Sequence, residues 1–265
     1  MSNLPLSLLE EVRKKNPVVL TIANMVTPDK VADALSAIGA SPIMSVAPEE
    51  APAMVELADA ITINLGTLNQ EQAQEISTIL DANPKHKPLV LDPVAIGASK
   101  YRLNFAQHLL SKYQFTVIRG NAGEIATLAN SAWTSHGIDS GNGTGNIKEI
   151  AQKVAQQYKC TVVLTGKEDV ITDGNRTFIN SLSTKYFATN VGSGDMLSSI
   201  IAAFLAVNND PYLAASSATK IFTAAGVKAA RETSGFGHWQ IKLMDELAQI
   251  NSSEIFQFYK KRFLI

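Results

Sequence analysis

The chain has 265 residues, 46% of them hydrophobic and 18% charged, which is enough apolar sequence for an enzyme-sized core. Its formal net charge of −1 excludes a general electrostatic attraction to nucleic acid or to acidic membranes. The single cysteine, Cys160, excludes an internal disulfide and fits a reducing compartment. Because no signal-peptide core opens the chain and the longest apolar run, 196–207, is too short to cross a bilayer, we expect a soluble cytoplasmic protein.

Five short apolar runs, each ending in polar or glycine residues, recur through the first two thirds of the chain. They cover residues 18–24, 60–66, 88–94, 115–121 and 161–166. Runs that are apolar almost throughout are typical of strands buried on both faces, so they predict a parallel sheet covered by helices on both sides. Helical patterns fill the intervals, at residues 30–38, 69–81, 104–112, 122–129 and 147–159.

The last third of the chain departs from this alternation. Residues 169–181 (DVITDGNRTFINS) predict two short strands around an Asp-Gly turn, hence a small antiparallel hairpin on the sheet. After Asp195 the pattern is mostly helical. No repeat or linker-like change of composition interrupts the chain, so residues 1–265 are expected to form one α/β domain. The glycine-rich segment 136–146 lacks the preceding strand and the spacing of a dinucleotide fingerprint, and we expect a surface loop there.

Polar residues follow several of the predicted strands. In open parallel sheets, ligands bind beyond the carboxyl ends of the strands, which is where Asn24, Asp92, Asn121 and Thr165 fall. Each also has a structural explanation. Asp92 can turn the chain before a proline, and Asn121 is spaced from Glu124 like a helix N-cap and its partner. Because all of these strand ends meet at one edge of one sheet, the set as a whole favours a ligand site.

The segment TNVGSGDMLSSIIAAFLAV, residues 189–207, places two glycines and an acid at the start of an apolar helix. Glycines let backbone N–H groups surround an anion, and the N-terminus of the helix adds a positive potential. The GK[ST] of a Walker loop is absent. Asp195 could be no more than an acid favoured in a first helical turn, but beside an anion site it would repel the ligand. That cost is explained if Asp195 accepts a proton from an attacking group.

This segment resembles the G-x-G-D signature of the ribokinase-like kinases, whose aspartate acts as a base toward a substrate hydroxyl. Further motifs narrow the resemblance to the hydroxyethylthiazole kinases: NMVT, ASPIMS, NLGTL, LDPVAIGA, IRGNAGEIA and VVLTGKEDVI follow in that family's order within residues 16–240. The resemblance implies a ribokinase-like fold. It also implies ATP-dependent phosphorylation of the primary hydroxyl of 4-methyl-5-(2-hydroxyethyl)thiazole, in thiamine biosynthesis or salvage.

The resemblance also implies roles for particular residues. Asp195 would be the catalytic base, and Gly192 and Gly194 would offer backbone amides to the transferred phosphate. The other implied ligands form three groups: Arg119, Asn121 and Thr165 for ATP; Met44, Asn24, Gly66 and Gly192 for the alcohol; and Asp92 and Glu124 for Mg²⁺. Some of the magnesium contacts would run through water, because Mg²⁺ dehydrates reluctantly. Members of the family are typically homotrimers with sites between subunits, and the same is expected here.

The chain departs from the family pattern in two places. Many relatives carry cysteine at the position of Asp195. An aspartate is already ionised at neutral pH, and it is a competent substitute where positioning matters more than base strength. Relatives usually carry asparagine at the positions of Asp29 and Asp33, and Pro28 and Lys30 are also unusual. If this segment borders the substrate pocket, the resemblance therefore specifies the type of reaction better than the identity of the alcohol.

Other functions remain open on the sequence alone. One is a kinase for another small ring-bearing alcohol, such as hydroxymethylpyrimidine or pyridoxal. The fold also hosts a nucleotide-dependent NAD(P)H-hydrate dehydratase, but SPIMS and RGNAGEI match the thiazole branch better. The third is a nucleotide sensor without catalysis, against which the three acids Asp92, Glu124 and Asp195 argue.

Overall fold

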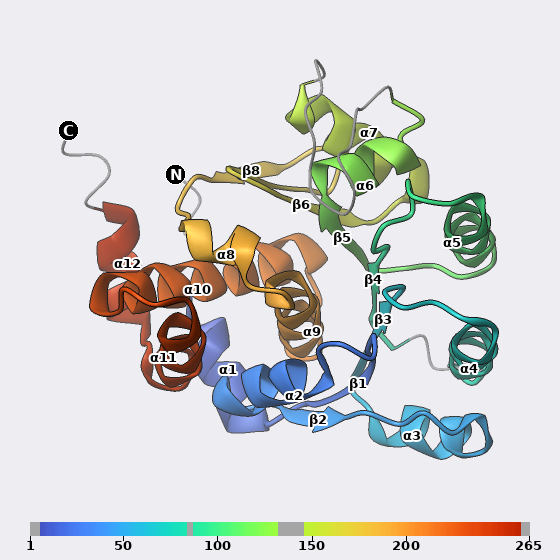
Figure 1. The fold of residues 1–265 in the computed structure, drawn as a ribbon, viewed down its shortest axis with the longest axis horizontal. Helices are drawn as coiled ribbons and strands as arrows, with labels where there is room; N and C mark the ends of the chain where they lie inside the picture. Colours follow the sequence, from blue (N-terminus) through green and yellow to red (C-terminus); the bar gives the residue numbers. More distant parts are fainter. Residues whose placement is uncertain (1–5, 84–86, 132–145, 261–265) are drawn as a thin grey trace.

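A central eight-stranded sheet organises the computed structural model, which describes residues 6–83, 87–131 and 146–260 (Figure 1). The strand order is β2-β1-β3-β4-β5-β6-β7-β8. Pairing is parallel from β2 across to β6 and antiparallel between β6, β7 and β8. The mostly parallel sheet with a terminal antiparallel hairpin is thereby confirmed. The strands are β1 Val18–Ile22, β2 Ser41–Ile43, β3 Ala60–Asn64, β4 Leu89–Asp92, β5 Val117–Asn121, β6 Thr161–Thr165, β7 Asp169–Thr172 and β8 Thr177–Asn180.

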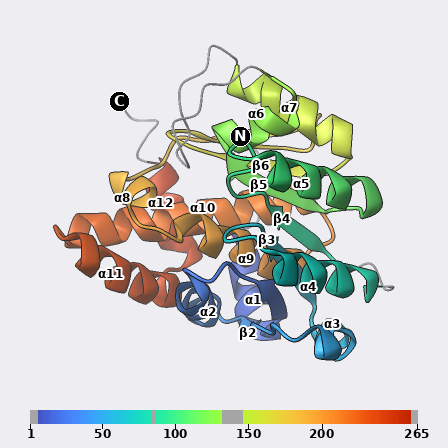
Figure 2. The same ribbon diagram turned by 45° about the vertical axis from the view of Figure 1, so that its right-hand side comes forward.

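Helices cover both faces of the sheet (Figures 1 and 2). One layer comprises α1 Leu8–Lys15, α2 Pro28–Ala37, α8 Lys185–Thr189, α9 Ser193–Leu205, α10 Pro211–Glu232, α11 Phe236–Gln249 and α12 Ser252–Lys260. The other comprises α3 Ala51–Leu57, α4 Gln70–Asp81, α5 Lys100–Lys112, α6 Ala122–Leu128 and α7 Ile147–Tyr158, with a short 3-10 turn at Pro48–Glu50. Each layer closes its own hydrophobic core against the sheet.

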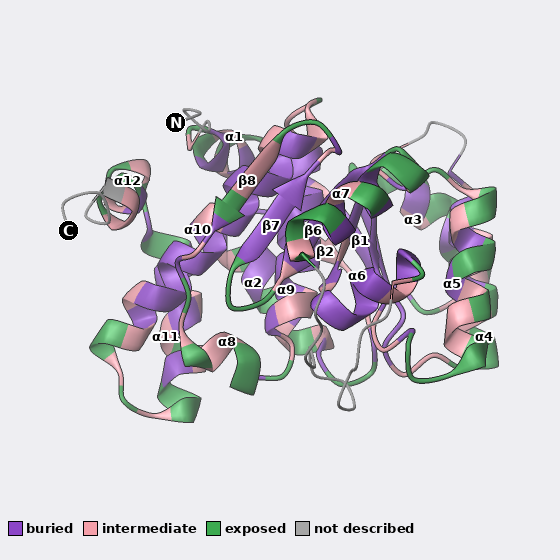
Figure 3. Cartoon of the chain, turned by 90° about the horizontal axis from the view of Figure 1, so that it is seen from above, coloured by how far each residue is buried: buried purple, intermediate pink, exposed green. Residues whose placement is uncertain are grey.

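Successive strand residues point into opposite cores. Val19 packs with the layer of α9 and α10, and Leu20 packs with the layer of α3 to α7. Val90 and Leu91 divide in the same way on β4. Because both faces are covered, β1 and the strands from β3 to β7 are mostly buried (Figure 3), which is why their sequences read as continuous apolar runs rather than alternating ones. The two edge strands, β2 and β8, are more exposed.

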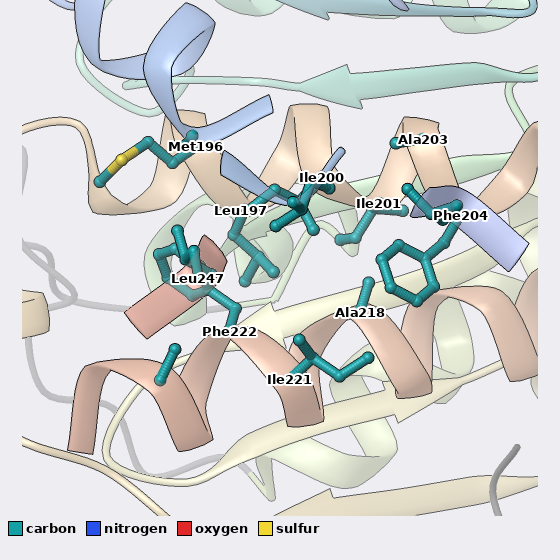
Figure 4. Close-up of a cluster of buried hydrophobic side chains, with 14 of the residues drawn as sticks. Met196, Leu197, Ile200, Ile201, Ala203, Phe204, Ala218, Ile221, Phe222 and Leu247 are labelled. Atoms are coloured by element: carbon teal, nitrogen blue, oxygen red, sulfur yellow. The ribbon is translucent and has the colours of Figure 1, made fainter. Parts of the chain in front are cut away.

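The helices α9 and α10 supply much of the first core, and α9 lies against the sheet. It contacts β1, β3 and β4 on one side and α10 on the other. Figure 4 shows its apolar side chains meeting those of α10, with Phe204 beside Ala218 and Leu197 near Phe222. A helix enclosed in this way is apolar nearly all round. Among the described residues, no helix is both long and apolar enough to span a bilayer.

Some elements differ from the sequence prediction. The strand β2 was not predicted, because it has three residues and contains Pro42, which the edge of a sheet tolerates. The helix α3 was also missed. Helix α5 begins earlier than expected, at Lys100, since Ser99 caps it by accepting from the Arg102 N–H at 3.3 Å. The glycine-rich segment lies outside the described residues up to position 145, and Asn146 caps α7.

Candidate active site

Asp195 lies in the first turn of α9 and accepts three side-chain hydrogen bonds. Its Oδ2 receives the Thr27 hydroxyl at 2.6 Å and the Asn24 amide at 2.7 Å, and its Oδ1 receives the Asn64 amide at 3.1 Å. The donors come from three places: Asn24 follows β1, Asn64 ends β3, and Thr27 precedes α2. The topology therefore brings distant segments onto one carboxylate.

Backbone N–H groups fix which way the two amides point. The Val26 N–H donates to Asn24 Oδ1 at 2.9 Å, and the Gly66 N–H donates to Asn64 Oδ1 at 2.8 Å. With their oxygens engaged, both amides turn their NH₂ groups toward Asp195, whose carboxylate oxygens accept from them. A Cβ at Gly66 would lie 2.7 Å from Asn24 Cβ, so this close approach requires glycine.

Two glycines at the start of α9, Gly192 and Gly194, allow side chains from other elements to approach the helix closely. Gly192 is the N-cap residue, with a φ of +97°, and a Cβ there would lie 2.9 Å from Thr27 Cγ2. A Cβ at Gly194 would lie 2.0 Å from Arg119 Nη1. The guanidinium therefore rests against bare backbone at the N-terminus of α9, where helix geometry favours an anion.

Arg119 connects the ends of neighbouring strands. Its Nη2 donates to Thr165 Oγ1 at 2.7 Å, and its Nη1 lies 3.3 Å from Asp92 Oδ2. Asp92 is fully buried and also accepts from Ser198 Oγ at 2.8 Å. Burial raises the pKa of Asp92, Arg119 lowers it, and the nearby carboxylates of Asp195 and Glu124 raise it further.

Glu124 caps α6 and also lies near the carboxylates of Asp92 and Asp195. It forms a capping box with Asn121, accepting from that residue's N–H at 2.8 Å, and it also accepts from the Ala95 N–H at 2.8 Å. Burial raises the pKa of Glu124, while these backbone N–H groups and Arg119 lower it. The capping explanation and the candidate metal role therefore apply to the same side chain.

A divalent cation fits the acids at this edge. Asp92 Oδ1 is buried without a hydrogen-bond partner among the described residues, although Oδ2 of the same carboxylate has two. A buried carboxylate oxygen without a partner is costly unless a ligand satisfies it. No group of three or more metal-binding side chains occurs in the described part of the chain, so water and nucleotide oxygens would have to complete the coordination of Mg²⁺.

A cavity of about 570 Å³ opens beside Arg119. Its polar wall includes Arg119, Asn121, Thr165 and Gly194, and its apolar wall includes Phe187 and Phe222. The arrangement suits a ligand that combines an anionic part with a flat apolar part.

The structure brings most of the predicted residues into two adjoining groups. Asn24, Gly66 and Gly192 surround Asp195, whereas the predicted ATP and metal residues surround the cavity and Asp92. Met44 directly follows β2, one strand farther out than Asn24, and is only partly buried.

Three contributing residues, Thr27, Asn64 and Ser198, lie outside the set predicted from the sequence. The signals for the first two were the motifs NMVT and NLGTL, in which each stands beside or near a residue that was singled out. Ser198 lies three positions after Asp195, which places both on the same side of α9.

The atypical residues of α2 fall into two groups. Asp29 and Asp33 are exposed. Pro28 is the first residue of α2, where a proline is favoured, and Lys30 Nζ donates to the Val191 oxygen at 2.9 Å. Lys30 therefore supports the glycine segment directly.

The comparisons with known proteins agree with one another. The model of the "Hydroxyethylthiazole kinase family" matches residues 9–253. The hydroxyethylthiazole kinase of Limosilactobacillus reuteri (strain DSM 20016) is 52% identical over 253 residues, covering 96% of this chain and 94% of its own. That of Haemophilus influenzae (strain PittEE) is 40% identical, covering 94% of this chain and 96% of its own.

Solved structures are also similar to this chain. The hydroxyethylthiazole kinase protein of Pyrococcus horikoshii OT3 superposes with a TM-score of 0.86 at 35% identity, over 94% of both chains. An ADP complex of Bacillus subtilis pyridoxal kinase gives a TM-score of 0.57 at 20% identity, over 79% of this chain and 91% of its own. At that identity the second likeness shows the ribokinase-like fold alone.

Proposed function

The chain belongs to the hydroxyethylthiazole kinase family, and from this we propose that it transfers the γ-phosphoryl group of ATP to the primary hydroxyl of 4-methyl-5-(2-hydroxyethyl)thiazole. The product would be the thiazole phosphate used in thiamine biosynthesis or salvage. The observation that carries the proposal is the position of Asp195, held by three donors at the N-terminus of α9 and adjoining Gly194 on the cavity wall.

Asp195 acts as the general base in this proposal. As the alcohol oxygen bonds to the γ-phosphorus, the bond from that phosphorus to the β–γ bridging oxygen breaks and ADP leaves, while the alcohol proton passes to a carboxylate oxygen of Asp195. Asn24, Thr27 and Asn64 hold that carboxylate in place, and they are neutral, so they orient the base without adding a cation beside it. A loose phosphoryl-transfer transition state depends more on positioning than on base strength.

The nucleotide phosphates occupy the polar end of the cavity. Arg119 and Thr165 bind them, with Asn121 nearby, and the backbone amides of Gly192 and Gly194 receive the transferred phosphoryl group. The open backbone at Gly194 and the N-terminus of α9 both favour an anion there.

Mg²⁺ would be held by Asp92 and Glu124, and when bound it supplies positive charge to the phosphate oxygens. Arg119 and Ser198 both engage Oδ2 of Asp92, which leaves Oδ1 for the ion or its water. Glu124 is fixed by the N–H groups of Ala95 and Asn121. These contacts hold the acids in position before any ligand arrives.

The alcohol site is proposed to use Met44, Asn24, Gly66 and Gly192, and to be completed in a homotrimer. Exposed apolar side chains around this edge support a second copy of the chain: Met25 is 77% exposed, Val26 61% and Val191 62%. Burying them against another subunit would remove apolar surface from water. A cytoplasmic location fits this small-molecule chemistry.

The test is a substrate panel with the purified chain, ATP and Mg²⁺. ADP release is measured with hydroxyethylthiazole, hydroxymethylpyrimidine, pyridoxal and hydrated NADH, and the product mass is determined. We expect phosphorylated hydroxyethylthiazole with the highest kcat/KM. A higher kcat/KM for another alcohol would change the substrate, and dehydration of hydrated NADH without phosphoryl transfer would overturn the kinase assignment.

A further inference from the structure

Arg102 stands in the first turn of α5, outside the residues given a role so far. Its Nη1 donates to the backbone oxygens of Leu65 and Val94, the latter at 3.2 Å. The two carbonyls belong to different loops, the first after β3 and the second after β4. One guanidinium nitrogen therefore joins two segments at the carboxyl edge of the sheet.

Each of these loops leads to a different part of the site. Leu65 lies between Asn64, which donates to Asp195, and Gly66, which abuts Asn24. The loop after β3 thus supports the base.

The loop after β4 supports the acids beside the phosphates. Val94 lies two residues after Asp92 and directly before Ala95, whose N–H donates to Glu124 at 2.8 Å. Arg102 therefore contacts the loop of the base and the loop of the metal acids at the same time.

Both loops hold an unfavourable backbone conformation close to the carbonyl that Arg102 binds. Thr67 has a φ of 48° and Ala95 a φ of 56°, both in the left-handed region that non-glycine residues rarely adopt. Such conformations persist only where surrounding contacts determine them. The Leu65 N–H bond to the Asp92 oxygen at 3.0 Å supplies one such contact, and Arg102 supplies two more.

We propose that Arg102 is a positioning residue that fixes the loop of Asn64 and Gly66 relative to the loop of Asp92 and Ala95. The inference deepens the proposed kinase function and rests on it. An arginine suits the task, because one planar nitrogen offers two diverging N–H groups and stays charged at all relevant pH values. Without it the base and the metal acids lose their fixed separation, and a misplacement of about 1 Å can cost ~10²-fold in rate.

The chain offers a matched control for a cation bound to carbonyl oxygens. Lys87 Nζ donates to the backbone oxygens of Val55 at 2.6 Å, Glu56 at 2.7 Å, and Ala58. These groups stand just before β3 and β4, at the end of the strands remote from the site. Lys87→Met removes a comparable set of bonds without touching either catalytic loop.

The experiment compares Arg102→Met, Arg102→Lys and Lys87→Met in the full chain. We measure melting temperature, kcat/KM for the alcohol, and hydrogen exchange of the Gly66 and Ala95 amides in the free protein. We expect Arg102→Met to lose about 10–10²-fold in kcat/KM and to exchange both amides faster. Arg102→Lys should recover part of each loss, and Lys87→Met should lower the melting temperature with kcat/KM and both amides unchanged.

The proposal is overturned if Gly66 and Ala95 exchange as in the wild type, or if kcat/KM simply follows the melting temperature in all three variants. If Arg102→Met fails to fold, Arg102→Lys provides the test by itself. A lysine variant with wild-type amide exchange and wild-type kcat/KM also overturns the proposal. If the wild type does not phosphorylate hydroxyethylthiazole, the proposed function fails, and the exchange measurement on the free protein still decides what Arg102 does.

Discussion

The carboxylates of Asp195, in the first turn of α9, and Asp92, at the end of β4, have contrasting surroundings. Asp195 is partly exposed, and its side-chain donors among the described residues, Asn24, Thr27 and Asn64, are all neutral. Asp92 is fully buried beside the guanidinium of Arg119 and keeps one oxygen without a partner in the described structure. The first environment suits a group that must receive a proton, and the second suits a group that must hold positive charge near phosphates. From this contrast we expect Asp195 and Asp92 to have different roles, although both are aspartates.

The largest effect is expected from removing the proton acceptor. Asp195→Asn keeps the shape of the side chain, and kcat should fall by ~10²–10⁴-fold, as for other general bases. The matched control is Asp210→Asn, whose carboxylate pairs with Arg176 on the surface. Steady-state kinetics on both variants make the test. If Asp195→Asn kept most of its turnover, Asp195 would return to the role of an acid favouring a helix N-terminus.

A smaller loss is expected when Arg119 is displaced from the start of α9. In Gly194→Ala the new methyl group would lie 2.0 Å from Arg119 Nη1, so the guanidinium must move. We expect kcat/KM for ATP to fall by roughly 10²-fold while the chain still folds. Gly237→Ala is the control, because a Cβ there would meet no described atom within 4 Å beyond its own chain neighbours and helix backbone. Equal kinetics in the two variants would show that the contact of Arg119 with α9 is unimportant.

A several-fold effect is expected from Met44→Ala, which distinguishes a packing role of Met44 from a role in binding the alcohol. Truncating a buried methionine costs ~2–5 kcal/mol of stability when the residue belongs to the core. Met44 is only partly buried, so Met44→Ala should raise the KM for the alcohol several-fold, leave the KM for ATP unchanged and lower the melting temperature little. A large drop in melting temperature with an unaltered alcohol KM would contradict the pocket assignment.

The smallest effect concerns a third acid, which has neither kind of environment. Burial raises the pKa of Glu75 from 4.5 to about 7, and its Oε1 has no partner among the described residues. Between these pH values the folded chain keeps a proton that the unfolded chain releases, so stability falls as pH rises. In Glu75→Gln this part of the decline should disappear, whereas the exposed Glu71→Gln on the same helix should follow the wild type. Melting curves from pH 4.5 to 8 decide it, and identical curves for all three proteins would refute the burial argument.

Much of the fold was predictable because strands buried on both faces must be apolar throughout. The strands from β1 to β6 other than β2, and the hairpin, follow from that constraint and from turn chemistry. The short β2 could not be found this way, because three residues with a proline carry no periodic signal. That residues 1–265 form one domain remains a prediction.

Where a residue ends a strand, as Asp92 and Asn121 do, the sequence could place it at the carboxyl edge of the sheet. Thr27 and Ser198 could not be identified in the same way, because taken singly each is an ordinary helix cap or helix residue. Asn64 does end β3, but it lies inside the apolar run predicted over residues 60–66. Their contacts arise only in the folded chain, where Thr27 and Asn64 donate to Asp195 and Ser198 donates to Asp92. Arg102 is the extreme case, since a cation on a helix surface gives no local sign that two loops depend on it.

The most direct test of the contrast is nucleotide binding by Asp195→Asn and Asp92→Asn, measured by calorimetric titration with a non-hydrolysable ATP analogue and Mg²⁺. If the base and the charge-holding acid have separate roles, Asp195→Asn should bind the analogue as the wild type does. Asp92→Asn should bind it at least about tenfold more weakly, which corresponds to about 1.4 kcal/mol. Equal losses in the two variants, or a loss confined to Asp195→Asn, would contradict the division of roles.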